Sequence, residues 1–511
     1  MTGHPPTLFS GGRLYSPADP TATAMLVRDG RIAWLGAAAD APPADETVDL
    51  DGALVTPAFV DAHMHTTDTG LAVDGLDLSG VRSAAEVLDA VAAFAAAKPA
   101  DGVVLGHRWD ESFWPDQTLP TAAELDRAAS GRRVYLLQAS CHSALCSAAL
   151  LPAAEGVAGY DGSSWVKEHA HHAVRAVALA SITPSQRSSA QRAALSRAAS
   201  LGIASVHECG GPGTSSEEDF ASVLALSGGG LPQVFGYWGE LGGAAKAREM
   251  GAAGAGGDLY ADGALGSRTA SVRSAYADGP GCGDAFVTGE QAGEHLLDCV
   301  SVGVQGGFHA IGDAAIEAVL EGFAIAATAV GLDKLRAGRH RIEHVELIDK
   351  PMIARMVEFG VVASVQPVFD LLWGGPDRMY AQRLGVERAM ASNPIGQMHA
   401  TGVALAFGSD SPVTVQDPWT TVVAAASPRN PVYRMSVRAA FAASSRGGWR
   451  AAGQDGVGVL SPGQSATFAV WDTPGGVHNG LPVLLQDSDG VVPERPVCRR
   501  TVLHGETIFK E

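Results

Sequence analysis

Residues 54–65 read Leu-Val-Thr-Pro-Ala-Phe-Val-Asp-Ala-His-Met-His, a short apolar run that ends in two histidines. Side chains alternate between the faces of a strand, so His63 and His65 are predicted to point one way and Met64 the other. Two imidazoles side by side at the end of a buried strand suit a divalent metal such as zinc. A pair of surface histidines would show the same short pattern, so the rest of the chain must decide.

Further apolar runs follow at intervals, and helical patterns separate several of them. They lie near residues 203–208, 233–238, 258–262, 304–309, 340–344, 361–366 and 403–410. Strands that alternate with helices indicate a parallel sheet, and with the run near 55–62 they make about eight, the number that closes a barrel. We therefore predict an α/β fold with a TIM (β/α)8 barrel as the catalytic domain, formed by residues 54–69 and 183–454.

Two smaller units are expected outside the barrel. Short strands with a turn signal at Asp29-Gly30 precede it and a matching set follows it, so residues 1–53 and 455–511 are predicted to form one composite β-sandwich domain. About 120 residues separate the first barrel strand from the helix before the second, far more than a normal connection. Residues 70–182 are therefore predicted to form an inserted α/β subdomain that covers the barrel mouth.

The composition limits the classes of partner. The 511 residues include 36 Lys and Arg against 55 Asp and Glu, a net charge of -19, which argues against nucleic acid and anionic membranes. No run of about 20 apolar residues is present. The six cysteines show no C-x-x-C pair, so we expect them to be reduced and mostly buried. We expect a cytoplasmic enzyme with a small-molecule substrate, either a monomer or a homo-oligomer.

Polar residues stand at the carboxyl ends of several proposed strands, the edge where barrel enzymes assemble their active sites. Beyond the two histidines of the first strand, they are His309, His344, Asp410 and the segment from Asp258 to Asp262. A lone histidine after an apolar run is more often a core residue, and Asp410 before Ser-Pro would also cap a turn. Their joint placement on strands one, five, six and eight nevertheless favours a metal-dependent site.

The order of these motifs resembles the amidohydrolase superfamily: H-x-H after the apolar run, two single histidines, and a late Gly-Ser-Asp at 408–410. Further motifs are similar to the branch that contains N-substituted formamide deformylases, over nearly the whole chain. They are Trp109-Asp110-Glu111, the Asp-Gly-Ala-Leu-Gly-Ser-Arg run at 262–268, His-Ala-Ile-Gly-Asp at 309–313, Arg-Ile-Glu-His at 341–344 and Ser-Val-Gln-Pro at 364–367.

The resemblance implies that His63, His65, His309 and Asp410 surround metal, while His344 either binds a second metal or polarises the substrate. The implied reaction is hydrolysis of a non-peptide C–N bond, in an amide or formamide of a small molecule. A bound divalent cation, with zinc the first choice, lowers the pKa of its water to give hydroxide. Asp410 would act as general base and then acid, and His344 would stabilise the oxyanion.

One position departs from the family pattern: two-metal members of the superfamily bridge their ions with a carbamylated lysine, and Asp258 stands at that position here. The aspartate is shorter, so we expect it to miss the same point unless the backbone moves. Three hypotheses follow. A single ion binds the remaining ligands, which is the favoured case; Glu208, beside His207 at the end of the second strand, replaces the bridge; or metal binds poorly. Two ions are the alternative to one.

Two other functions stay open, and the second of them follows from the missing lysine. A deaminase would use the same one-metal chemistry on an amidine-like or cyclic substrate. A catalytically impaired binding protein would keep the barrel without turnover. Deamination and amide hydrolysis differ in their products. Deamination releases ammonia, whereas amide hydrolysis releases a carboxylic acid and an amine.

Candidates for substrate contacts lie in the inserted segment and after the fourth proposed strand. They are Trp109, Asp110, His142, Asp262 and Arg268. The first three would contribute to a substrate lid, with a structural role as the alternative. Asp262 and Arg268 would anchor substrate or order a loop, and a salt-bridged loop is their alternative.

Overall fold

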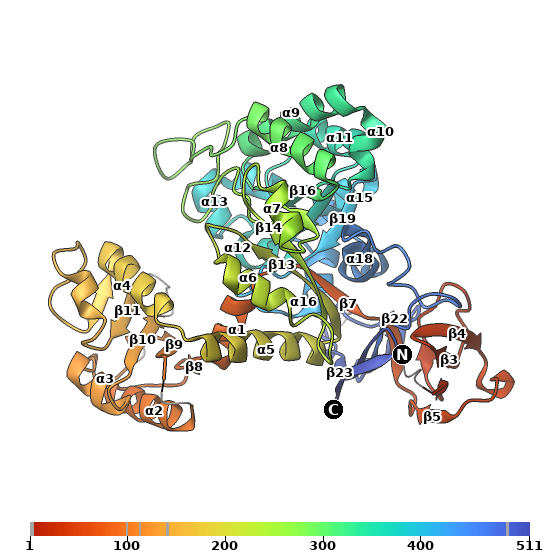
Figure 1. Cartoon of the computed structure of the whole chain (residues 1–511), viewed down its shortest axis with the longest axis horizontal. Coiled ribbons are helices and arrows are strands. Elements are labelled where there is room, and N and C mark those ends of the chain that lie inside the picture. The colour runs from red at the N-terminus through yellow and green to blue at the C-terminus, as the bar shows by residue number, and fades with distance from the viewer. Residues whose placement is uncertain (1–4, 99–100, 112–113, 139–142, 487–489) are drawn as a thin grey trace. The chain divides into compact units, whose positions relative to one another are not determined.

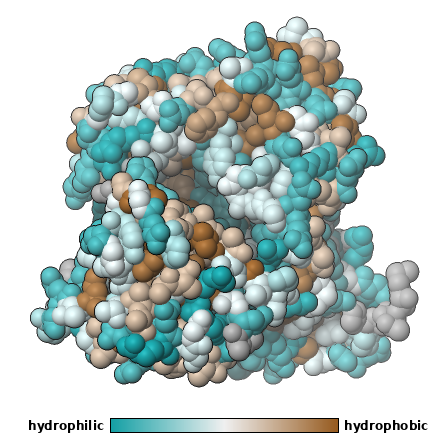
Figure 2. Space-filling model, turned by 60° about the vertical axis from the view of Figure 1, so that its left-hand side comes forward, coloured by the Kyte–Doolittle hydropathy of each residue, from teal (hydrophilic) through white to brown (hydrophobic). Residues whose placement is uncertain are grey.

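The computed structural model describes residues 5–98, 101–111, 114–138, 143–486 and 490–511. The chain divides into two compact units, residues 1–65 with 195–511 and residues 66–194. No helix in the described ranges has the length and apolarity needed to span a bilayer. On the face drawn in Figure 2, hydrophobic residues occur in scattered groups among hydrophilic ones.

Parallel strands form a barrel in the larger unit, with helices around their outside (Figure 1). In order they are β7 (Phe59–Met64), β13 (Ile203–Gly210), β14 (Gln233–Trp238), β15 (Gly254–Ala255), β16 (Gln305–Ala310), β17 (Arg341–His344), β18 (Val362–Val365) and β19 (Ala404–Phe407). The backbone beyond β19 closes the barrel onto β7: the Asp410 N–H donates to the His63 carbonyl at 2.7 Å, and the His65 N–H donates to Ser411 at 2.9 Å. The predicted eight-stranded α/β barrel is confirmed.

Two strands differ from the prediction. The apolar run near 55–62 is divided between β6 (Leu54–Pro57), which pairs with β20 (Phe468–Asp472) outside the barrel, and β7. The strand predicted at 258–262 is replaced by the two-residue β15, which ends at Ala255, just before Gly256-Gly257. A Cβ on Gly256 would lie 2.6 Å from the Gly307 backbone, and Gly257 has a φ of +72°. The chain therefore turns before Asp258, and the segment beyond it is a loop.

Local signals set the helix boundaries. Thr288 forms a capping box at the start of α8 (Gly289–Val302), and Gly303, with a φ of 78°, ends it. The other helices of this unit are α6 (Glu217–Leu224), α7 (Ala244–Glu249), α9 (Asp313–Val330), α10 (Leu332–Ala337), α11 (Lys350–Phe359), α12 (Pro367–Trp373), α13 (Met379–Leu384), α14 (Val386–Ala391), α15 (Ile395–Thr401), α16 (Pro418–Ala426), α17 (Val437–Ala442) and α18 (Gly448–Ala451), with short helical turns η1 (Ala38–Asp40), η4 (Pro431–Tyr433) and η5 (Ala443–Gly447).

Both ends of the chain contribute to two β-sheets. One contains, in order, β4 (Arg31–Gly36), β3 (Ala24–Arg28), β1 (Thr7–Ser10) and β5 (Glu46–Asp49); the other contains β2 (Arg13–Leu14), β6, β20, β23 (Val497–Leu503) and β24 (Glu506–Lys510). A separate pair is β21 (Val477–His478) and β22 (Leu481–Pro482). Phe9 packs edge-on against Phe468 with ring centres 5.0 Å apart, in a core shared by both sheets.

The second unit, residues 66–194, has its own sheet. Its strands are β12 (Trp165–Lys167), β11 (Ser143–Cys146), β10 (Arg133–Gln138), β9 (Val103–Trp109) and β8 (Leu76–Asp77) in spatial order. Its helices are α1 (Thr66–Asp74), α2 (Ala84–Ala97), α3 (Ala122–Ala128), η3 (Leu151–Ala154), α4 (Glu168–Ala180) and most of α5 (Pro184–Ser200). The expectation that this segment covers the barrel mouth stays a prediction.

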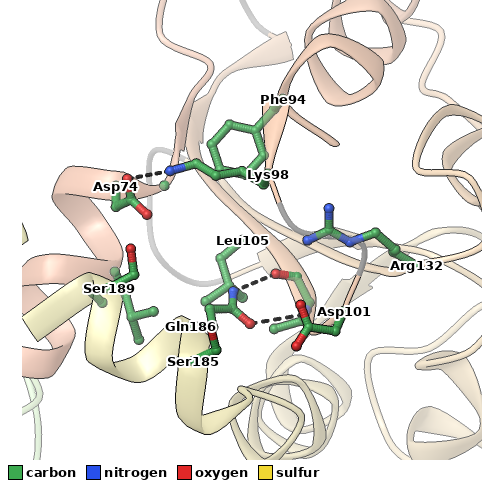
Figure 3. A pocket seen from close by; sticks show the side chains of 13 residues that line it. Asp74, Phe94, Lys98, Asp101, Leu105, Arg132, Ser185, Gln186 and Ser189 are labelled. Carbon is green, nitrogen blue, oxygen red and sulfur yellow. Dashed lines mark hydrogen bonds and ion pairs between the residues drawn. The ribbon is translucent and has the colours of Figure 1, made fainter. Parts of the chain in front are cut away.

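The second unit contains a small cavity of about 110 Å³ (Figure 3). Several of its polar groups are engaged within the protein. Lys98 pairs with Asp74, and the Gln186 side chain donates to the Val103 carbonyl at 2.7 Å while accepting from the Val103 N–H at 3.2 Å. This pattern indicates a structural hollow.

Candidate metal centre

Six imidazoles and carboxylates from five strands of the barrel meet at the carboxyl ends of those strands. They are His63, His65, His309, His344, Asp258 and Asp410. All are buried except His65, whose side chain is 15% exposed. The positions that the sequence placed on strands one, five, six and eight are therefore brought together.

Asp258 lies at the centre of this group. Its Oδ1 is 3.4 Å from Nε2 of His63, 3.5 Å from Nδ1 of His309 and 3.7 Å from Nε2 of His344. Its Oδ2 is 3.2 Å from Nε2 of His65. We expected this shorter side chain to miss the site unless the backbone moved. The side chain reaches the histidines because the neighbouring glycines leave room for the backbone of Asp258 to lie close to the barrel axis.

Gly239 shows how close that approach is. A Cβ there would lie only 2.7 Å from the backbone carbon of Asp258, nearer than real side chains allow. Gly256 has the same relation to the next strand. Small residues on both sides thus let the loop after β15 deliver the aspartate.

Asp410, in the segment after β19, is the second carboxylate of the group. Its Oδ1 lies 3.2 Å from Nε2 of His65 and 3.5 Å from Nε2 of His63. Donor atoms around a tetrahedral zinc with bonds of about 2.0–2.1 Å are themselves about 3.3 Å apart. The observed separations match that spacing.

Several donor atoms lack any partner of their own. Among the described residues, His63 Nε2, His309 Nδ1, His344 Nε2 and Asp258 Oδ1 are buried without a hydrogen bond. Buried polar atoms are nearly always satisfied, so four orphans in one place call for a missing partner. Two donor trios, His63-His65-Asp258 and Asp258-His309-His344, share the aspartate. These residues therefore fit a divalent cation.

In three of the histidines, the ring nitrogen that points away from Asp258 lies within hydrogen-bond distance of an oxygen atom. Glu343 Oε2 lies 2.9 Å from Nδ1 of His63, and Gln366 Oε1 lies 2.8 Å from Nδ1 of His344. The Gly263 carbonyl lies 3.1 Å from Nε2 of His309. These oxygens accept hydrogen bonds, so in each neutral ring the nitrogen beside the oxygen carries the proton. The other ring nitrogen then offers its lone pair to a metal ion among the donor atoms.

The charges of the group support one another. Burial lowers the pKa of His65, but Asp258 and Asp410 outweigh it, and the pKa lies well above its usual value. Burial raises the pKa of Asp258, yet His63, His309 and His344 hold it well below the usual range. Two ionised carboxylates in a buried site require positive charge, which protonated imidazoles or a divalent ion can supply.

The end of β13 differs from expectation. His207 enters the barrel, where Arg341 Nη1 donates to its Nδ1 at 2.9 Å, and Cys209 lies on the same face near His63. Side-chain alternation turns Glu208 to the other face, and it belongs to none of the donor groups found among the described residues. The hypothesis that Glu208 replaces the bridge therefore finds no support among these donor groups. The register of β13 against β7 shifts between Val206 and Glu208, which a single sequence does not reveal.

The lid candidates fall in the second unit. Trp109 is fully buried there, and its indole N–H donates to the Leu136 carbonyl at 2.8 Å. This corrects the prediction of a substrate contact, since the side chain belongs to the core. Asp110 directly follows β9. His142 lies outside the described residues.

Asp262 and Arg268 organise the loop after β15. The buried Asp262 carboxylate accepts from the N–H groups of Gly312 at 2.7 Å and Ser271 at 2.8 Å. Arg268 makes two bonds of 2.9 Å to the Asp278 carboxylate. The loop-ordering alternative describes both residues, and neither belongs to the donor groups found among the described residues.

Sequence reasoning gave no role to several residues around the centre. Glu343 and Gln366 orient histidines, as described above, and the Tyr260 hydroxyl donates to Asp258 Oδ2 at 3.2 Å. Asp61 accepts from the N–H of Ser409 at 2.8 Å. A usable signal existed for Asp61, which precedes His63 by two residues and so shares its strand face.

Known proteins resemble this chain over most of its length. The model of the "Amidohydrolase family" matches residues 46–509. Protein LONG AFTER FAR-RED 3 of Arabidopsis thaliana is 28% identical, over 89% of this chain and 84% of that protein. N-substituted formamide deformylase of Arthrobacter pascens is 33% identical over 150 residues, 28% of each chain. The crystal structure of an uncharacterized metal-dependent hydrolase from Pyrococcus furiosus superposes with a TM-score of 0.75 at 24% identity, over 91% of this chain and 98% of that one, and supports the fold.

Proposed function

The chain belongs to the amidohydrolase family, and from this we propose that it is a metal-dependent hydrolase of a non-peptide C–N bond in a small amide or formamide. The observation that carries the proposal is the group of four histidines and two aspartates at the barrel mouth, whose orphaned donor atoms suit a divalent ion. The similarity to a protein named N-substituted formamide deformylase supports the substrate class.

The donor atoms support two overlapping ion sites. His63 and His65 form one set with Asp258, and His309 and His344 form the other with the same aspartate. A shared carboxylate favours a centre for two ions, zinc being the first choice, over the single ion that the sequence favoured. Asp258 rather than Glu208 then takes the place of the family's bridging lysine.

The residues around the centre suit hydrolysis. A divalent ion, when bound, lowers the pKa of a coordinated water and polarises a carbonyl group. Asp410 is placed to accept the proton of the attacking water and to return it to the leaving nitrogen. Burial raises the pKa of Asp410, but His63, His65 and His344 more than offset this, so the carboxylate is ionised and ready to accept.

Deamination remains the second candidate, because the same residues serve an amidine-like carbon equally well. The binding-protein alternative rested on the missing lysine. The position of Asp258 among the histidines supplies the negative charge that the carbamylated lysine would carry, which favours an active enzyme.

The test is turnover with product identification. Protein loaded with zinc, manganese or cobalt is incubated with N-substituted formamides, simple amides and cyclic amidines, and formate, amine and ammonia are quantified. We expect formate or another carboxylate together with an amine. Ammonia from amidines alone would replace the proposal with a deaminase, and no turnover by metal-loaded protein would favour a binding protein.

Asp410→Asn tests the assigned base. It keeps the shape and one ligand oxygen but removes the proton acceptor, so we expect turnover to fall about 10²- to 10⁴-fold while the ion between His309 and His344 is retained. Asp377→Asn, at an exposed position, is the matched control and should retain full activity.

A further inference from the structure

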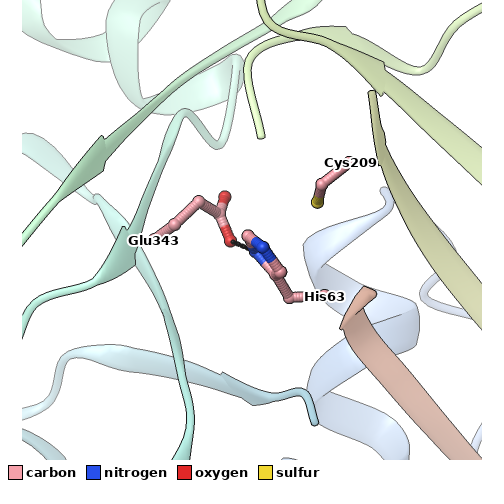
Figure 4. A group of neighbouring side chains, drawn as sticks. All are labelled: His63, Cys209 and Glu343. Atoms are coloured by element: carbon pink, nitrogen blue, oxygen red, sulfur yellow. Dashed lines mark hydrogen bonds and ion pairs between the residues drawn. The ribbon is translucent and has the colours of Figure 1, made fainter. Parts of the chain in front are cut away.

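A buried ion pair lies directly beneath the proposed metal centre. Glu343 Oε2 is 2.9 Å from Nδ1 of His63 and accepts a second bond of 2.9 Å from Arg341 Nη2. Arg341 Nε donates to the other oxygen, Oε1. The three side chains are fully buried. Figure 4 shows Glu343 on β17 directed at His63 on β7.

We propose that Glu343, held by Arg341, is a positioning residue that fixes His63 for metal binding. The inference rests on the proposed function, because it concerns the ion that His63 would bind. A carboxylate only accepts, so Nδ1 of His63 must carry the proton and Nε2 must present its lone pair toward Asp258 and Asp410. A negative partner also strengthens the imidazole as a donor.

Arg341 is itself fixed from several strands. Its Nη2 donates to the Ala62 carbonyl on β7 at 2.6 Å and to Ser364 Oγ on β18 at 2.8 Å. Its Nη1 donates to His207 on β13, and its guanidinium stacks over the Tyr237 ring on β14 at 4.3 Å. The Glu343 carboxylate is thus anchored to the barrel walls, so the direction of His63 depends on strand positions rather than on a mobile side chain.

A competing explanation is that this cluster binds an ion of its own. Cys209 points toward His63 in Figure 4, and the thiol, the imidazole and Glu343 form a further donor trio. Both oxygens of Glu343 are already used by Arg341, and Oε2 also by His63. A cation there would face the guanidinium at close range, so like-charge repulsion opposes it. The cluster therefore orients a ligand and is not a second ion site.

Three variants separate the two explanations. Glu343→Gln keeps an acceptor for His63 but removes the charge. Because it leaves Arg341 buried without a counter-charge, the double variant Arg341→Met/Glu343→Gln removes both charges and protects the test against misfolding. Cys209→Ala is the matched control, since it removes the third member of the trio and leaves the ion pair intact.

The readouts are zinc affinity by chelator competition, the visible absorption of the cobalt-loaded protein, and the unfolding temperature of the metal-free protein. We expect both glutamate variants to bind zinc about 10- to 100-fold more weakly and to shift the cobalt bands, with the double variant unfolding near the wild-type temperature. Cys209→Ala should match wild type in affinity and spectrum.

Each contrary result has a distinct meaning. Unchanged affinity and spectrum in both glutamate variants would overturn the positioning role and leave the proposed function standing. A loss in Cys209→Ala equal to that in Glu343→Gln would show that the trio binds the ion itself, which also overturns it. Wild-type protein that takes up none of zinc, manganese or cobalt would overturn both the proposed function and this inference.

Discussion

Oδ2 of Asp258 lies 3.2 Å from Nε2 of His65, on the opposite side of the carboxylate from the oxygen that faces His309. One carboxylate therefore reaches both halves of the histidine group. In the proposed two-ion centre this carboxylate would bind both ions, so its loss should affect both.

The first prediction concerns metal content. Asp258→Ala should lose at least one of the two proposed ions, measured by elemental mass spectrometry on protein purified without chelator. Glu208→Ala is the matched control, because this carboxylate is absent from the donor groups of the described residues, and it should retain the wild-type content. Loss of an ion from Glu208→Ala but not from Asp258→Ala would reverse the assignment of the bridging residue.

A second prediction tests how the short side chain reaches the centre. A Cβ on Gly239 would meet the Asp258 backbone at 2.7 Å, so Gly239→Ala should push this loop outward and weaken zinc binding. Overpacking of this kind costs about 1–3 kcal/mol, so the unfolding temperature should also fall. Gly80→Ala, at a glycine with no atom within 4 Å of the added Cβ, should change neither quantity.

The same prediction has a rescue. In the Gly239→Ala background, Asp258→Glu adds one methylene and should recover part of the zinc affinity by spanning the added distance. Equal zinc affinity in wild type and Gly239→Ala would mean that backbone approach does not position the carboxylate.

The ligands at strand ends were predictable from the sequence because the rule that places them is local. His63, His309 and His344 each end an apolar run, and parallel strands bring such ends to one edge. The position of Asp258 was not predictable, since it depends on how closely three neighbouring segments approach. The same holds for Glu208, whose direction depends on a register shift between two strands.

The partners of the ligands were hidden for a related reason. Glu343 meets His63 across 280 positions of sequence, and Gln366 meets His344 from the next strand. Such pairs are set by the closed barrel and not by spacing along the chain. Trp109 was proposed for a substrate lid with a structural role as the alternative, and its indole lies in a core.

A third prediction concerns barrel closure. Asp61 on β7 accepts from the N–H of Ser409 at 2.8 Å, from its hydroxyl at 2.6 Å and from Gln416 at 3.1 Å. Asp61→Ala would leave these buried donors unsatisfied, at a cost of about 1–3 kcal/mol each for the groups that find no water. The unfolding temperature of the metal-free protein should fall, whereas Asp40→Ala at an exposed position should leave it unchanged. An unchanged unfolding temperature in Asp61→Ala would show that other contacts close the barrel.

The last prediction concerns pH and stability. Burial lowers the pKa of His340 to about 4, with the nearby His295 acting in the same direction. The Gly306 N–H donates to Nδ1 of His340 at 2.7 Å, so the folded ring is neutral. In the unfolded chain His340 takes up a proton near pH 6.5, whereas in the folded protein it does so only near pH 4. The contribution of the neutral ring to stability is therefore complete above pH 6.5 and is lost as the pH falls toward 4. The loss amounts to about 3 kcal/mol over that window.

His340→Asn removes this pH-dependent contribution to the free energy of unfolding, while the amide oxygen of the new side chain still accepts from the Gly306 N–H. As the pH falls from 6.5 to 4, the unfolding temperature of the wild type should therefore fall more steeply than that of the variant, whatever their difference at neutral pH. His399→Asn, at an exposed position, is the matched control for a histidine-to-asparagine change. Parallel pH curves for His340→Asn and wild type would mean that the buried ring takes up its proton without unfolding the barrel.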